Sequence, residues 1–213
     1  MQQPEILSLT HDAMRPAYDV VVVGSGYGGG IAASRLSRAG QRVCVIERGR
    51  EVPVGGFPSR MPELRRELQV HSGKKRSGSG TGLYDVRLGS DINVVVGCGL
   101  GGGSLINAGV ALRPDARVFE DKAWPDAIRE DGLLDLGFAR AADMLRPTRH
   151  AGAPSLTKYQ ALEAASGAFG TPPVPAPVTI SFDDVMNPAG IEQPACTLCG
   201  DCCSGCNVGA KNS

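Results

Sequence analysis

A strand–loop–helix–strand pattern near the N-terminus constrains the fold of this chain more than any other feature. The apolar, β-branched run Tyr18–Val23 predicts a buried strand, and the glycine-rich segment Gly24–Gly30 follows it directly. Ile31–Ala39 has helical spacing, Gly40 is a typical helix end, and Arg42–Glu47 is a second β-branched run. The pattern has the length of a βαβ unit. The sequence therefore predicts an α/β fold.

The glycines of the first loop have the spacing of a dinucleotide-binding fingerprint. In Gly24-x-Gly26-x-x-Gly29, the first glycine permits a tight turn, the second lets a pyrophosphate approach the backbone, and the third allows close helix–strand packing. The N-terminus of the following helix offers N–H groups and partial positive charge to that pyrophosphate. Glu47 ends the second strand, where a carboxylate accepts hydrogen bonds from ribose hydroxyls and disfavours the 2′-phosphate of NADP. NAD, the ADP half of FAD and a glycine turn without ligand all remain open.

Composition narrows the class of protein. Ten of the 29 glycines lie in two short loops, residues 24–30 and 97–103, which indicates specific loops rather than a low-complexity chain. The chain has 22 basic and 22 acidic side chains, which argues against charge-driven binding to nucleic acid. No apolar run reaches the roughly 18–20 residues of a spanning helix, and the N-terminus lacks the features of a secretory signal. We expect a soluble, cytoplasmic protein with no nucleic-acid partner and no transmembrane segment.

The second glycine loop is the most specific motif. Residues 97–107 read GCGLGGGSLIN, and Ala111, Pro114 and Glu120 follow. This stretch resembles the signature of the glucose–methanol–choline (GMC) flavoprotein oxidoreductases, and its GGGSLIN core is most similar to the cholesterol oxidase branch. The segments GSGYGGG, ERG and AWPDAIRED fit the same branch. The resemblance covers about residues 17–213. The alternative for this loop is a glycine-rich turn that serves packing alone.

The resemblance implies an extended FAD in a Rossmann-like domain. It places Tyr27 and Gly28 at the pyrophosphate, Glu47 at the adenosine ribose, and the second loop along the flavin ring. The cofactor-binding residues expected from both loops are Gly24, Gly26, Tyr27, Gly28, Gly29, Glu47, Gly102, Gly103, Asn107, Ala108 and Val110.

The resemblance also implies the reaction class, which is hydride transfer from the CH–OH group of a sterol-like or other hydrophobic alcohol to FAD, with a base that accepts the proton. In the family this base is a histidine far toward the C-terminus, and none of His11, His71 and His150 stands in a matching context. We therefore expect the catalytic residue beyond residue 213, and interpret the chain as an inactive N-terminal fragment whose sheet leaves apolar faces uncovered. The expected domains are a tail (1–16), an FAD-binding domain (17–130) and the start of a substrate domain (131–213).

Five of the seven cysteines crowd into residues 196–206. Cys196, Cys199, Cys202 and Cys206 have the spacing of a bacterial ferredoxin run, with Asn207 in place of the usual proline. Such thiolates bind an iron–sulfur cluster or zinc, and unliganded thiols or a redox disulfide are the further alternatives. The segment CTLCGDCCSGCNVGAKNS also resembles a Cys-rich stretch in sterol-dehydrogenase-like and alcohol-dehydrogenase-like GMC proteins of bacteria. Some dehydrogenase relatives carry an iron–sulfur cluster near this region. An iron–sulfur cluster would favour a dehydrogenase with an electron-transfer partner over an oxidase.

The rest of the chain predicts simpler elements. A β-hairpin is expected from residues 84–88 and 92–96, a flexible surface loop at 72–82, and a strand at 178–182. Helices are expected at 61–69, 124–130, 138–145 and 158–168. Two rival functions remain beside the flavoenzyme, namely an NAD-linked Rossmann dehydrogenase, which leaves the second loop unexplained, and an iron–sulfur electron-transfer module.

Overall fold

The computed structural model describes residues 6–130 and 132–211, which form two compact units. Unit 1 contains residues 6–108 and 198–209, and unit 2 contains residues 109–130, 132–197 and 210–211. This division differs from the expected boundary at residue 130 in two ways, since residues 109–130 belong to unit 2 and the segment 198–209 belongs to unit 1. The functional assignment of the domains stays a prediction, and residues 1–5 of the expected tail lie outside the described residues.

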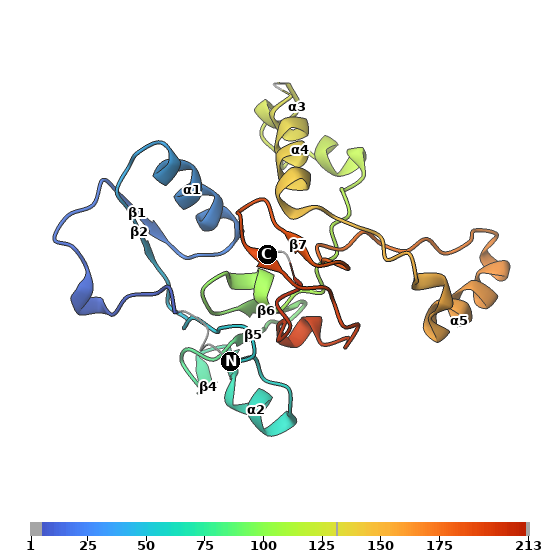
Figure 1. The fold of residues 1–213 in the computed structure, drawn as a ribbon, viewed down its shortest axis with the longest axis horizontal. Coiled ribbons are helices and arrows are strands. Elements are labelled where there is room, and N and C mark those ends of the chain that lie inside the picture. The colour runs from blue at the N-terminus through green and yellow to red at the C-terminus, as the bar shows by residue number, and fades with distance from the viewer. Residues whose placement is uncertain (1–5, 131, 212–213) are drawn as a thin grey trace. The chain divides into compact units, whose positions relative to one another are not determined.

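The βαβ unit of unit 1 confirms the prediction from the sequence. β1 (Val20–Val23) and β2 (Val43–Ile46) pair in parallel, and α1 (Tyr27–Arg38) connects them and lies beside both (Figure 1). The left-handed φ of +84° at Gly40 ends the helix as expected. The predicted start at Ile31 is wrong, since α1 begins four residues earlier and includes Gly28–Gly30. The helix begins there because its third residue, Gly29, has no side chain and can lie against the turn before it.

Several apolar side chains of the βαβ unit are exposed to solvent. On β1, Val21 is 53% exposed and Val23 is 85% exposed, and Ile31 on α1 is 61% exposed. The expectation of a buried strand at this position is therefore wrong within the described residues, although the β-branched sequence does form the strand. The expectation of uncovered apolar faces is confirmed.

A second, four-stranded sheet completes unit 1, with strand order β4-β3-β5-β6. Its strands are β3 (Leu68–Ser72), β4 (Lys75–Gly78), β5 (Tyr84–Leu88) and β6 (Asn93–Gly97), and the remaining elements of the unit are α2 (Met61–Arg66), η1 (His11–Ala13), η2 (Gly102–Leu105) and η6 (Cys202–Ser204). The predicted β5–β6 hairpin is confirmed. The helix predicted over 61–69 ends at Arg66, and the predicted flexible loop contains β4. All four residues of β4 are exposed, so backbone pairing with β3 rather than a hydrophobic pattern forms this strand.

Unit 2 is mainly helical. Its elements are η3 (Ala116–Glu120), α3 (Ala127–Glu130), α4 (Leu133–Leu145), η4 (Ala153–Ser155), α5 (Thr157–Ser166), η5 (Gly167–Phe169), β7 (Val185–Met186) and β8 (Glu192–Gln193). The rings of Phe119 and Phe138 lie 6.2 Å apart and hold η3 against α4. The strand predicted at 178–182 is wrong, because Val178 and Ile180 form only isolated bridges to single residues of other segments. No helix among the described residues is long and apolar enough to cross a membrane.

Candidate functional site

The first glycine loop has the backbone geometry that its fingerprint predicts. Gly24 has a φ of +89°, which an L side chain rarely adopts, and this forms the turn after β1. A Cβ atom at Gly29 would lie 1.9 Å from the carbonyl oxygen of Gly24, so only glycine fits where α1 meets the turn. Around Gly26 and Gly28 a Cβ atom would meet no atom within 4 Å. The backbone at the start of α1 is therefore accessible to a ligand.

Glu47 follows β2, and its carboxylate faces the first loop. Its Oε2 accepts hydrogen bonds from the Ser25 N–H at 2.9 Å and the Ser25 hydroxyl at 2.7 Å, and its Oε1 accepts one from the Gly49 N–H at 2.8 Å. Burial acts to raise the pKa of Glu47, but these hydrogen bonds outweigh it and hold the pKa below the ordinary value of 4.5. The side chain is therefore a preorganised anion at neutral pH.

The second glycine loop packs directly on the first. Gly102 has a φ of +62°, and a Cβ atom there would lie 2.8 Å from the Cα atom of Gly26. A Cβ atom at Gly49, two residues after Glu47, would lie 2.2 Å from the backbone nitrogen of Gly99. Glycine at these positions lets the backbones approach to a distance that any side chain would prevent. The glycines of the two loops, together with Gly49, therefore let the three segments around Glu47 pack closely.

Two side chains of the first loop connect it to the second. The Ser25 hydroxyl accepts a hydrogen bond from the Gly101 N–H at 2.9 Å, and the Asn107 amide donates one to the Tyr27 hydroxyl at 2.8 Å. Tyr27 and Asn107 were predicted from the sequence, whereas Ser25 was missed. Ser25 is 9% exposed, and no signal in the sequence singles it out, because its burial and its hydrogen bond with Gly101 arise only when the two loops pack together.

The structure places ten of the eleven predicted cofactor-binding residues in unit 1. These are Gly24, Gly26, Tyr27, Gly28, Gly29, Glu47, Gly102, Gly103, Asn107 and Ala108. Gly102 and Gly103 begin η2, and Ala108 is exposed at the end of this part of the unit. Val110 belongs to unit 2, where it is 54% exposed and forms a bridge with Val178. The contact of each of these residues with a cofactor stays a prediction.

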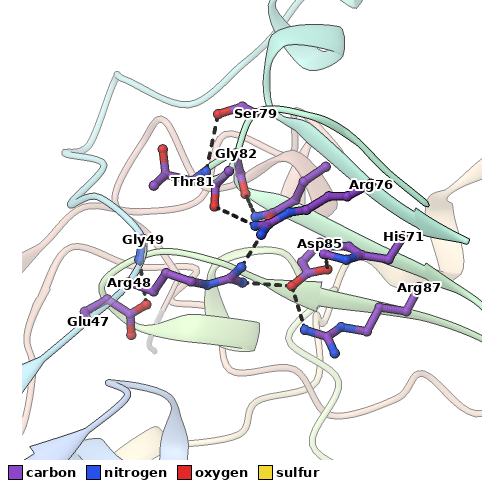
Figure 2. A network of polar contacts seen from close by, with 12 residues as sticks. Glu47, Arg48, Gly49, His71, Arg76, Ser79, Thr81, Gly82, Asp85 and Arg87 are labelled. Carbon is purple, nitrogen blue, oxygen red and sulfur yellow. Dashed lines mark hydrogen bonds and ion pairs between the residues drawn. The ribbon is translucent and has the colours of Figure 1, made fainter. Parts of the chain in front are cut away.

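A buried polar network supports the segment that carries Glu47 (Figure 2). Gln69 on β3 and Asp85 on β5 are register partners, and their exposures are 0% and 1%. Arg48, the residue after Glu47, donates to Oε1 of Gln69 at 3.1 Å and to Oδ2 of Asp85 at 2.8 Å, and Arg87 donates to the same Oδ2 at 3.1 Å. Burial acts to raise the pKa of Asp85, but the two arginines outweigh it and the pKa lies below the usual range.

The cysteine-rich segment 198–209 belongs to unit 1, which also contains the two glycine loops. Asn207 accepts a hydrogen bond from the Phe57 N–H at 2.9 Å and donates one to the Phe57 carbonyl at 3.1 Å. A Cβ atom at Gly205 would lie 2.0 Å from the ring of Phe57, and the Tyr84 hydroxyl donates to the carbonyl of Cys203 at 3.0 Å. Asn207, which departs from the ferredoxin pattern, is therefore one of the residues that dock the segment.

The predicted metal site divides between the two units. Cys199, Cys202 and Cys206 belong to unit 1, and Cys196 belongs to unit 2. Over residues 6–130 and 132–211, no group of three or more His, Cys, Asp or Glu side chains is arranged to hold a metal ion. The assignment of a metal or cluster to these cysteines stays a prediction.

The three histidines lie in different settings. His11 is in η1, His71 is on β3 with its Nε2 3.3 Å from Oδ1 of Asp85, and the ring of His150 stacks on Phe182 at 4.5 Å in unit 2. The first two belong to unit 1, in the N-terminal segment and the four-stranded sheet, and not to the glycine loops. Nothing in these contacts assigns a catalytic base.

Comparison with known proteins identifies relatives along nearly the whole chain. A family model described as an FAD binding domain matches residues 19–54. A cholesterol oxidase of Mycobacterium tuberculosis is 30% identical over 94% of this chain and 36% of its own length. An uncharacterized GMC-type oxidoreductase of the same organism is 38% identical over 51% of this chain and 16% of its own length. A long-chain-alcohol oxidase of Arabidopsis thaliana is 35% identical over 54% of this chain and 14% of its own length.

The chain thus spans about a third of the length of the cholesterol oxidases it matches. The match to the FAD binding domain covers β1, the first glycine loop, α1, β2 and Glu47, the elements that the geometry brings together. The names of these relatives, a cholesterol oxidase and a GMC-type oxidoreductase, agree with the family that the second glycine loop predicted. The chain is similar to cholesterol oxidases along nearly its whole length and to a GMC-type oxidoreductase along about half of it.

Proposed function

We propose that this chain is the FAD-binding part of an oxidoreductase that oxidises a CH–OH group of a sterol-like or other hydrophobic alcohol. The observation that carries the proposal is the packing of the second glycine loop on the first, with Gly102 against Gly26 and Ser25 between Glu47 and Gly101. NAD binding would require only the first loop and the acidic residue, and would leave this packing without a purpose. The similar proteins named for cholesterol and for long-chain alcohols support an alcohol substrate.

The residues present fit an extended FAD. The open backbone at Gly26 and Gly28 and the positive end of α1 suit a pyrophosphate, and the ionised Glu47 suits ribose hydroxyls. Gly103, where a Cβ atom would meet nothing within 4 Å, leaves backbone accessible to a flat ring. The groups proposed to line that ring are Gly103, Asn107, Ala108 and Val110.

Bound FAD supplies the hydride acceptor. The residues of this chain then have the tasks of binding and orientation, because a preorganised carboxylate and rigid backbone amides hold a ligand without paying for rearrangement. The proposal assigns no proton-accepting base to His11, His71 or His150. We place the βαβ unit in a Rossmann-like domain and the start of a substrate domain in residues 131–213. An electron-transfer partner and a cytoplasmic location stay predictions.

The absorption spectrum of the purified protein tests the cofactor. Flavin bands in the native protein, or after FAD is added and the excess removed, are the expected result. Absence of flavin absorbance, together with failure to bind added FAD, would overturn the proposed FAD-binding function. A fluorescence change on addition of NADH would favour the NAD-linked dehydrogenase instead. Iron absorbance without flavin would favour the electron-transfer module.

The substrate class needs a separate measurement. In the protein that contains this chain, an alcohol substrate added without oxygen should bleach the yellow flavin absorbance. Cholesterol and a long-chain primary alcohol are the two probes, because both chemical classes occur among the named relatives. Bleaching by a small polar alcohol but by neither probe would overturn the proposed preference for a hydrophobic alcohol.

A further inference from the structure

We propose that Ser25 is a positioning residue for FAD, which fixes the carboxylate of Glu47 and the second glycine loop relative to each other. This inference rests on the proposed FAD-binding function and assigns a role to a residue outside the fingerprint glycines. It is carried by the hydrogen bonds of one side chain, which is 9% exposed, to partners from two other segments.

The distances determine which way the hydroxyl points. A serine hydroxyl has one hydrogen to donate and two lone pairs to accept with. The Glu47 Oε2 atom lies at 2.7 Å, whereas the alternative acceptor, the Gly99 carbonyl oxygen, lies at 3.3 Å. The hydrogen therefore points to the carboxylate, the stronger acceptor, and a lone pair faces the Gly101 N–H at 2.9 Å.

The backbone of Ser25 reinforces this arrangement. Its N–H donates to the same Oε2 atom at 2.9 Å, so side chain and main chain hold one carboxylate oxygen together. The Gly49 N–H holds the other oxygen at 2.8 Å, which leaves the carboxyl plane little freedom to rotate. A carboxylate fixed in this way presents a defined edge to ribose hydroxyls, and the loop at Gly101 is fixed by the same hydroxyl.

Removal of the hydroxyl affects both partners in the same direction. In Ser25→Ala, Glu47 loses a hydrogen bond to its charged form, and the Gly101 N–H loses its acceptor in a partly buried position. Because a hydrogen bond to a charged group is at stake, FAD affinity should fall on the order of 10-fold to 100-fold. The charged group beside Glu47 is the Arg48 guanidinium. Because Ser25→Ala leaves Arg48 unchanged, the loss of FAD affinity reports on the Ser25 hydroxyl.

The experiment compares Ser25→Ala with Ser25→Thr, which keeps the hydroxyl, and with Ser37→Ala, which removes an exposed hydroxyl on α1. FAD binding is titrated over a pH series with the full chain, and circular dichroism checks that each variant folds. Ser25→Ala should weaken FAD binding and move the acid limit of binding to higher pH, because the pKa of Glu47 rises. Ser37→Ala should match the wild type, and Ser25→Thr should lie close to it.

A second readout needs no cofactor. Amide hydrogen exchange at Gly101 in the protein without added FAD should be faster in Ser25→Ala and close to wild type in Ser25→Thr. Unchanged exchange together with an unchanged acid limit would overturn the positioning role even if FAD binds well. Failure of the wild type to bind FAD would instead overturn the proposed function, and faster exchange would still support the link between Ser25 and the second loop.

Discussion

Arg48 and Asp85 form an ion pair, with 2.8 Å between Nη2 and Oδ2, that connects the segment after β2 to the middle of the second sheet. The Asp85 side chain is 1% exposed, whereas that of Arg48 is 46% exposed. Because Arg48 directly follows Glu47, the pair holds in place the segment that carries the predicted ribose-binding carboxylate. Figure 2 shows that Arg48 and Arg87 both reach the carboxylate of Asp85.

The two arginines should be redundant for stability. Arg48→Met or Arg87→Met alone should lower the free energy of unfolding by about 1 kcal/mol, because the other arginine still hydrogen-bonds Oδ2 of Asp85. The double variant leaves a buried carboxylate with neither guanidinium and should lose about 3–5 kcal/mol, more than the two single losses added. Urea unfolding measures the three values.

The exposed pair of Arg42 with Asp19 is the matched control, with 2.7 Å between Arg42 Nη2 and Asp19 Oδ1. Both of its members are open to solvent, so Arg42→Met should cost less than either single variant above. If the losses of unfolding free energy in Arg48→Met and Arg87→Met simply add in the double variant, the two arginines are not redundant partners of the Asp85 carboxylate.

Gly29 and Gly28 should respond in opposite ways to a methyl group. At Gly29 the new Cβ atom would lie 1.9 Å from a backbone oxygen, so Gly29→Ala should destabilise the protein by about 1–3 kcal/mol. At Gly28 the space is open and the backbone is helical, so Gly28→Ala should stabilise the protein by about 0.5–1 kcal/mol. If a pyrophosphate lies over Gly28, the same variant should bind FAD more weakly. Thermal unfolding and FAD titration separate the two effects, and equal stability changes would contradict the packing argument.

Stability should depend on pH through Glu47. Its pKa in the folded protein is below the ordinary value of 4.5, so the fold favours the ionised form. This contribution is fully present above about pH 4.5 and is lost as the pH falls through the lower folded-state pKa. Glu47→Gln should therefore lower the free energy of unfolding by about 1–2 kcal/mol at pH 7, and the difference from wild type should shrink on acidification.

The exposed Glu163 on α5 provides the control for this variant. Glu163→Gln should track the wild type over the same pH range in chemical unfolding. A difference between Glu47→Gln and wild type that stays constant down to pH 3, or grows on acidification, would contradict the stated role of the carboxylate.

The sequence predicted the first βαβ unit because its signals are local. A β-branched strand, a glycine spacing and an acidic residue at the next strand end each follow from backbone sterics and hydrogen bonding within about 30 residues. The start of α1 was missed because glycine normally disfavours a helix, and the close approach of Gly29 to Gly24 outweighs that preference.

The contacts between distant segments could not be predicted in this way. Asp85 and Gln69 are polar, yet they occupy the most buried positions of β5 and β3, where Arg48 from another segment hydrogen-bonds one oxygen of each. Ser25 stands at a position that the fingerprint leaves unspecified. Its role as a hydrogen-bond acceptor appears only when Gly101 lies beside it. Periodicity along one strand or spacing within one loop carries no information on such partners.

The cysteine run offers the last prediction, since its spacing indicates a metal site. Protein purified without oxygen should carry iron with acid-labile sulfide, or zinc, and Cys199→Ser or Cys206→Ser should remove it, because the spacing predicts each of them as a thiolate ligand. Cys203 is exposed in the same segment but outside the spaced run, so Cys203→Ser should keep the metal. Elemental analysis and the absorption spectrum measure the outcome. Equal metal content in all three variants, or none in the wild type, would leave the segment as a structural strap that Asn207 holds against Phe57.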